Sequence, residues 1–100
     1  MIRHTVMWKL HPQAEGQDRA ANARRIKGLL EGLIALVPEI KFLEVGINCL
    51  ADENNHDVIL NCEFADLAAL ERYQKHPEHL KVVGLIAPLR SARSAIDQEI

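Results

Sequence analysis

The chain has 100 residues, of which 48% are hydrophobic and 26% are charged, and its formal net charge is −2. These values are typical of one globular domain with a single core. The weakly acidic balance excludes the concentrated Lys/Arg surface that nucleic acids and acidic membranes attract, and four aromatic residues are too few for a base-stacking platform. No apolar run approaches the ~18 residues that a membrane span requires.

The cysteines point to a reducing compartment. Cys49 and Cys62 have neither zinc-site nor CxxC spacing, and one pair is no disulfide framework. We therefore expect two reduced, buried thiols. The N-terminus begins directly with an alternating pattern and lacks an apolar export signal. We expect a cytoplasmic domain.

Over residues 2–10, mostly apolar side chains occupy every second position and mostly polar ones lie between them, which predicts a half-buried strand. One face of this strand carries Ile2, His4, Val6, Trp8 and Leu10. The imidazole of His4 is the unusual group on this apolar face. Apolar residues at spacings of three and four then predict a long helix over residues 14–37, which Pro38 ends.

Two further strands are expected over residues 40–50 and 57–64, joined by a polar hairpin loop at 51–56. Asp66 is a suitable N-cap for a second helical region. His76-Pro77 bends that region, because the residue before proline is forced towards an extended backbone. A fresh helix then runs to Pro88, and a weaker strand covers residues 92–100.

The order β-α-β-β-α-β predicts an α+β fold: a ferredoxin-like sandwich with a four-stranded antiparallel sheet and helices on one face. The other face of the sheet is left bare. On it we expect apolar and small residues mixed with charged ones: Thr5, Met7, Phe42, Gly46, Ile59 and Ala95 beside Arg3, Lys9, Glu44, Asn61 and Glu63. Because apolar sheet faces usually mark association sites, we predict a homodimer through this face.

Three segments resemble the stress-responsive α/β-barrel (Dabb) domains. Residues 2–10 look like the first strand of these domains, and residues 40–48, with Leu43-Glu44-Val45-Gly46, look like the second. The segment Tyr73-Gln74-Lys75-His76-Pro77-Glu78-His79-Leu80 resembles their most recognisable signature. The resemblance covers essentially the whole chain as one domain, residues 1–100, and implies a dimeric α+β barrel.

The resemblance also implies candidate site residues. One plant member, olivetolic acid cyclase, closes a linear polyketide by aldol condensation without a cofactor. Its catalytic tyrosine and histidine, and a histidine on its first strand, correspond by position to Tyr73, His79 and His4. The expected pocket lining consists of Val6, Trp8, Leu30, Leu60 and His76. The chain departs from the cyclase at Lys27 and Leu30, where the cyclase has aromatic residues, and at Trp8, where it has a smaller aliphatic one.

Three functions follow as alternatives. The first is a cofactor-independent lyase or cyclase in which His79 and Tyr73 transfer protons on a small apolar carbonyl or polyketide-like compound. The second is a stress-linked structural dimer without chemistry, in which Trp8 fills the pocket and His76 merely caps a helix. The third is a carrier or sensor that binds an apolar ligand without converting it.

Other polar residues suggest no further site. His11, His56, His76 and His79 lack the spacing of a metal site on one helix face, so we expect neither a metal nor another cofactor. Arg90 and Arg93 are expected to lie on a solvated strand edge rather than to bind an anion.

Overall fold

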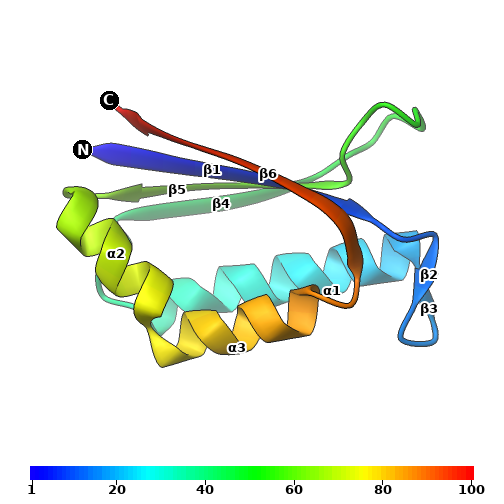
Figure 1. The fold of residues 1–100 in the computed structure, drawn as a ribbon, viewed down its shortest axis with the longest axis horizontal. Coiled ribbons are helices and arrows are strands. Elements are labelled where there is room, and N and C mark those ends of the chain that lie inside the picture. The colour runs from blue at the N-terminus through cyan, green and yellow to red at the C-terminus, as the bar shows by residue number, and fades with distance from the viewer.

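A four-stranded antiparallel sheet and a layer of helices make up the protein in the computed structural model, which describes residues 1–100 (Figure 1). The sheet has the order β4-β5-β1-β6, with both central strands paired antiparallel to their neighbours. Its strands are β1 (Ile2–Leu10), β4 (Phe42–Ile47), β5 (Val58–Phe64) and β6 (Arg90–Glu99). The helices lie on one face only, so the predicted ferredoxin-like α+β fold is confirmed.

The first helix is shorter than predicted because a small hairpin precedes it. Strands β2 (Gln13–Ala14) and β3 (Gln17–Asp18) pair around a tight turn in which Glu15 and Gly16 have φ of 52° and 75°. Helix α1 (Arg19–Glu31) begins only after Asp18, whose side chain accepts a hydrogen bond from Ala21 N at 2.8 Å. The 3-10 helix η1 (Gly32–Ala35) extends α1.

The second helical region is broken where the sequence predicts. Asp66 caps α2 (Leu67–Lys75) by accepting from Ala69 N at 2.8 Å. His76 has an extended backbone, with ψ of 134°, and α3 (Pro77–Ile86) begins at the following proline. Proline suits this first position because its missing N–H would have no partner there. None of the helices has the length and hydropathy needed to cross a membrane.

The core lies between the sheet and the helices. Alternate residues of β1 and β5 point into it, and Val6, Leu60 and Phe64 are at most 1% exposed. These alternating burial patterns confirm the predicted inner faces of both strands. The two termini lie side by side at one end of the sheet, where Ile100 N donates to Met1 O at 3.0 Å (Figure 1).

Two predicted positions are wrong. Thr5 pairs with Ile96 and Val6 with Ala95, and directly paired residues share a face. Ile96 therefore lies on the bare face, and Ala95 lies on the helix-facing side. The last strand begins at Arg90 rather than at residue 92, which the weak alternation of this segment did not reveal.

The cysteines differ in burial. Cys62 is buried as expected, but Cys49 is exposed, because β4 ends at Ile47 and Cys49 lies in the loop beyond it. Burial is the main cause that raises the pKa of the Cys62 thiol to about 12, and the charges of Asp97 and Glu63 add to it. Cys62 is therefore an uncharged core residue.

Candidate functional site

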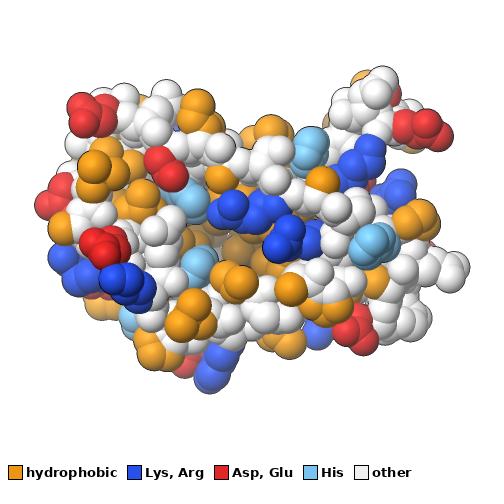
Figure 2. All heavy atoms as spheres, viewed as in Figure 1, with side chains coloured by type: hydrophobic (Ala, Val, Ile, Leu, Met, Phe, Trp, Pro, Cys, Tyr) orange, Lys and Arg blue, Asp and Glu red, His pale blue; other side chains and the backbone are white.

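A cavity of about 290 Å³ lies between the inner face of the sheet and the helices. Figure 2 shows it from outside as a hollow with hydrophobic side chains inside and Lys/Arg side chains at its edge. Eight of its twelve lining residues are hydrophobic. The lining consists of His4, Val6, Trp8, Leu30, Leu60, Tyr73, His79, Val82, Val83, Ile86, Arg90 and Arg93.

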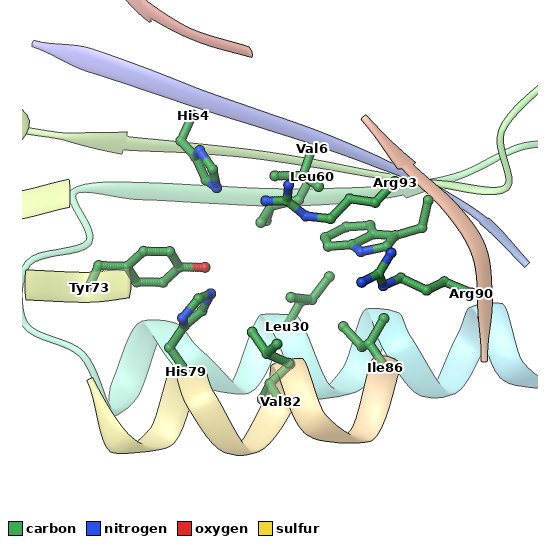
Figure 3. A pocket seen from close by; sticks show the side chains of 12 residues that line it. His4, Val6, Leu30, Leu60, Tyr73, His79, Val82, Ile86, Arg90 and Arg93 are labelled. Atoms are coloured by element: carbon green, nitrogen blue, oxygen red, sulfur yellow. The ribbon is translucent and has the colours of Figure 1, made fainter. Parts of the chain in front are cut away.

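The sheet and the long helix build the apolar wall. Val6 and Trp8 are buried on the inner face of β1 and line the cavity. Leu60 is the cross-strand partner of Val6 on β5, and Leu30 comes from α1 (Figure 3). Trp8 is only 6% exposed and forms part of the wall without filling the space. Four of the five expected lining residues therefore surround the cavity.

His76 is the fifth, and the structure places it elsewhere. Its Nδ1 accepts a hydrogen bond from Glu78 N at 3.1 Å, so the imidazole caps α3. A helix start leaves several backbone N–H groups without partners, and a side-chain acceptor just before the first turn satisfies one of them. The role of His76 is structural, as the simpler interpretation of the sequence predicts.

The Tyr73 hydroxyl is a buried polar group without a partner. Tyr73 is 0% exposed, and its ring packs against Phe64 at a centroid distance of 4.9 Å. Its hydroxyl points into the cavity and has no hydrogen-bond partner (Figure 3). Burial raises the pKa of this phenol above its ordinary value, so the group stays protonated at neutral pH. It is a free hydrogen-bond donor inside an apolar space.

The His79 imidazole lies against Tyr73, with ring centroids 4.3 Å apart. Its Nδ1 is 3.1 Å from Gln74 O, and because a carbonyl only accepts, Nδ1 carries the hydrogen. In the neutral ring, Nε2 then holds a free lone pair. Burial lowers the pKa of His79 below its ordinary value, although the bond to Gln74 O opposes this shift. His79 is therefore a neutral base at pH 7.

A second imidazole approaches from the sheet. His4 is 3% exposed, and its ring meets Tyr73 edge-on at a centroid distance of 6.1 Å. Its Nδ1 pairs with the carboxylate of Asp97, which lies directly opposite on β6. Asp97 fixes the orientation of His4 and was not predicted. Only the register between the first and last strands could have revealed it.

Arg90 and Arg93 lie on the edge strand β6, as expected, and Arg93 is exposed. Both also line the cavity, which the sequence analysis did not predict, and Figure 3 shows their guanidinium groups turned into it. The structure contains no cluster of three or more His, Cys, Asp or Glu side chains that could hold a metal ion.

The sequence matches the Stress responsive A/B Barrel Domain (Dabb) over residues 2–100. The chain belongs to the Dabb family. Among curated proteins, none matches it.

Solved structures share the fold over nearly the whole chain. A dimeric protein of unknown function with a ferredoxin-like fold, from Bacteroides fragilis, has a TM-score of 0.86 at 26% identity and covers 99% of this chain and 95% of its own. A Dabb family protein from Mesorhizobium loti has a TM-score of 0.78 at 23% identity, over 99% and 95%. Hydroxynitrile lyase from Passiflora edulis has a TM-score of 0.83 at 16% identity, over 99% and 92%. At such low identities, the last two show the fold alone.

Proposed function

We propose that this Dabb protein is a cofactor-independent lyase or cyclase that transfers a proton on a small carbonyl compound. The observation that carries the proposal is the Tyr73 hydroxyl, fully buried, unpaired and aimed into a cavity beside the free Nε2 of His79. Buried polar groups are nearly always hydrogen-bonded, so an oxygen atom of a ligand is a suitable partner for this hydroxyl.

The geometry suits proton abstraction next to a carbonyl group. His79 Nε2 takes the proton from the α-carbon, and the electron pair of the C–H bond moves onto the carbonyl oxygen as an enolate. The Tyr73 hydroxyl donates a hydrogen bond to that oxygen as its negative charge grows. The enolate carbon then attacks a second carbonyl carbon, whose oxygen takes the proton from His79. Alternatively, the enolate electrons break the bond between the β-carbon and a leaving group, and that group takes the proton from His79.

The two pKa shifts favour these roles. A lowered pKa keeps His79 unprotonated and able to accept the proton at pH 7, and a raised pKa keeps Tyr73 protonated and able to donate a hydrogen bond. The same fold occurs in the Passiflora edulis neighbour, which is named a hydroxynitrile lyase.

Deuterium exchange tests the reaction without knowledge of the natural substrate. Small ketones and aldehydes are incubated with the protein in D2O, and loss of their α-proton signals is followed by NMR. His79→Gln should slow exchange by about 100-fold or more, because it removes the base. His11→Gln, at an exposed histidine outside the cavity, is the matched control. Exchange by His79→Gln at the wild-type rate would contradict the proposal.

A ligand carrier is the second candidate, because the cavity walls are mostly hydrophobic. Such a protein would retain a bound compound and leave it unchanged. Mass spectrometry of protein purified under native conditions distinguishes the carrier from the enzyme. A carrier would be purified with its ligand bound, and that ligand would show no deuterium exchange. A structural dimer without chemistry is less well supported, because it requires a filled space beside His79.

We also propose that the protein is a homodimer through the bare sheet face. Met7, Phe42 and Ile96 are 36%, 41% and 61% exposed on this face. Pairing with a second copy would remove these apolar groups from water. The Bacteroides fragilis neighbour is described as dimeric. Light scattering at micromolar concentration should give twice the chain mass, and a monomer would refute the proposal.

A further inference from the structure

A bulge in β6 brings two arginines to the same side of the sheet. Arg90 pairs with Leu10 and Ala92 with Lys9, so Ser91 is an extra residue in this strand. Without the bulge, residues three apart would point to opposite faces. With it, Arg90 and Arg93 both face the helices and line the cavity (Figure 3).

Neither guanidinium has an acidic partner. Arg90 and Arg93 are absent from all ion pairs and side-chain hydrogen bonds of the protein. The cavity lining contains no Asp or Glu. Arg24 and Arg25 also lack partners, but they are exposed on α1 and hydrated by solvent. Arg90 is half-buried and shares its space with hydrophobic walls, where water compensates less. Arg93 is exposed, but unlike Arg24 and Arg25 it also lines the cavity.

The two ends of the cavity are chemically different. Tyr73, His79 and His4 form one end, Arg90 lies towards the other, and the Arg93 guanidinium reaches in between them, beside Val6 and Leu60 (Figure 3). A compound that spans this distance meets a hydrogen-bond donor and a base at one end and two positive charges at the other. Two unpaired positive charges lining one cavity favour an anion, and a guanidinium binds a planar carboxylate through paired hydrogen bonds.

We propose that Arg90 and Arg93 form a carboxylate-binding subsite, so that the compound handled by this protein is an oxo acid: its carboxylate is held at the arginines and its carbonyl group at Tyr73 and His79. The inference names the substrate class of the proposed reaction and in that respect rests on it. Carboxylate binding itself does not require turnover, so the two can be tested separately.

Paired ligands of equal shape and different charge test the subsite. Hexanoate and hexanamide are titrated into the protein by calorimetry, and the fluorescence of Trp8, the single tryptophan of the chain and the residue opposite Arg93, provides a second readout. Hexanoate should bind more tightly than hexanamide. Arg90→Gln/Arg93→Gln should raise the dissociation constant of hexanoate by at least about tenfold, because charge-assisted hydrogen bonds are lost. The dissociation constant of hexanamide should not change.

Two controls exclude general charge and folding effects. Arg24→Gln/Arg25→Gln makes the same change in net charge on the exposed side of α1 and should keep the hexanoate preference. Arg90→Lys/Arg93→Lys retains the positive charges and should keep most of the preference for hexanoate over hexanamide. This variant therefore still tests the subsite if the double glutamine variant is poorly folded.

The subsite is refuted if hexanoate binds no better than hexanamide, if millimolar hexanoate produces no signal, or if the glutamine variant of both arginines keeps the preference. A wild-type protein without hexanoate preference but with His79-dependent deuterium exchange contradicts the subsite alone. A wild-type protein that prefers hexanoate but shows no exchange contradicts the proposed reaction alone.

Discussion

The two faces of the sheet use the same four strands and treat their polar groups in opposite ways. On the bare face, polar side chains bond to each other: Arg3 pairs with Glu63 at 3.1 Å, and Thr5 Oγ1 donates to Asn61 Oδ1 at 2.7 Å. On the helix-facing side, the Tyr73 hydroxyl, contributed by α2, and two guanidinium groups face a cavity without partners.

That difference separates two kinds of surface. Polar groups that are already paired can be buried by another protein at lower cost than unpaired ones, because their hydrogen bonds persist. Polar groups left unpaired around an enclosed space need a small molecule to complete them. We therefore assign association to the bare face and ligand chemistry to the helix-facing side, and the following experiments test this assignment.

Two phenylalanines on opposite faces give the largest expected contrast. Phe64 is 0% exposed in the core, and Phe42 is 41% exposed on the bare face. Phe64→Ala should lower the free energy of unfolding by about 3–5 kcal/mol, through lost burial and a new cavity. Phe42→Ala should cost less than about 1 kcal/mol within one protomer.

Urea denaturation at low protein concentration measures both values with little contribution from association. Equal losses of stability in the two variants would mean that the faces are not distinct in packing.

A charge on the bare face should break the dimer and spare the fold. Met7 lies in the middle of this face, paired with Ile59 and Ser94. Met7→Asp would bury a carboxylate without a partner in the interface, and we expect the dissociation constant to rise by at least about 100-fold. Analytical ultracentrifugation measures it. Leu67→Asp, on exposed α2, is the control and should remain dimeric; dissociation of both variants would place the interface elsewhere.

On the other face, Asp97 should act by positioning His4, whose ring lines the cavity against Tyr73 and thereby helps to hold the Tyr73 hydroxyl in place. Asp97→Asn removes the negative charge bonded to His4 Nδ1, and we expect deuterium exchange to slow by about tenfold. The ¹⁵N shifts of the His4 ring report its tautomer and should change in the same variant. Glu99→Gln, two residues along β6, should alter neither. Slower exchange with an unchanged His4 tautomer would assign Asp97 a purely structural role.

The smallest effect concerns pH. Burial lowers the pKa of His79, and the positive charges of His4, Arg93 and His76 add to this. Exchange should therefore persist as the pH falls below about 6.5, the ordinary histidine pKa, and decline only once His79 becomes protonated. Arg93→Gln removes one positive charge and should raise the His79 pKa by less than about one unit.

NMR titration of the His79 ring measures this shift, with Arg25→Gln as the control. The same pKa affects folding: stability is full above the unfolded-state pKa and is lost as the pH falls towards the folded-state pKa, because the unfolded chain binds the proton first. A His79 pKa above 6.5 would contradict both expectations.

Local rules predicted much of the molecule. Period-two alternation correctly assigns the inner face of β1, and the rules for N-caps and proline place the starts of α2 and α3. These features depend on neighbours in sequence, so one chain is enough to read them. The resemblance drew attention to Tyr73, His79 and His4, and the structure brings their three rings together.

The misplaced or missed residues depend on strand register instead. Arg90 and Arg93 share a face only because of the bulge at Ser91, and Asp97 meets His4 only because β6 pairs with β1 in one particular alignment. Register between strands some 90 residues apart is set by packing of the whole sheet, which no local pattern encodes. The apolar spacing that predicts the first helix continues backwards past Gly16, and this conceals the β2–β3 hairpin, whose turn includes that glycine.

The adjacent termini have a consequence for how the site is encoded. Because Met1 and Ile100 meet at one end of the sheet, a short linker could close the chain into a ring. In that ring, α2, α3, β6 and β1 form one uninterrupted segment. Every polar residue of the cavity lies on it, whereas α1 and β5 contribute only apolar wall. A circular permutant opened in the exposed loop at residues 51–54 would carry the whole polar constellation within one continuous stretch in the middle of its chain.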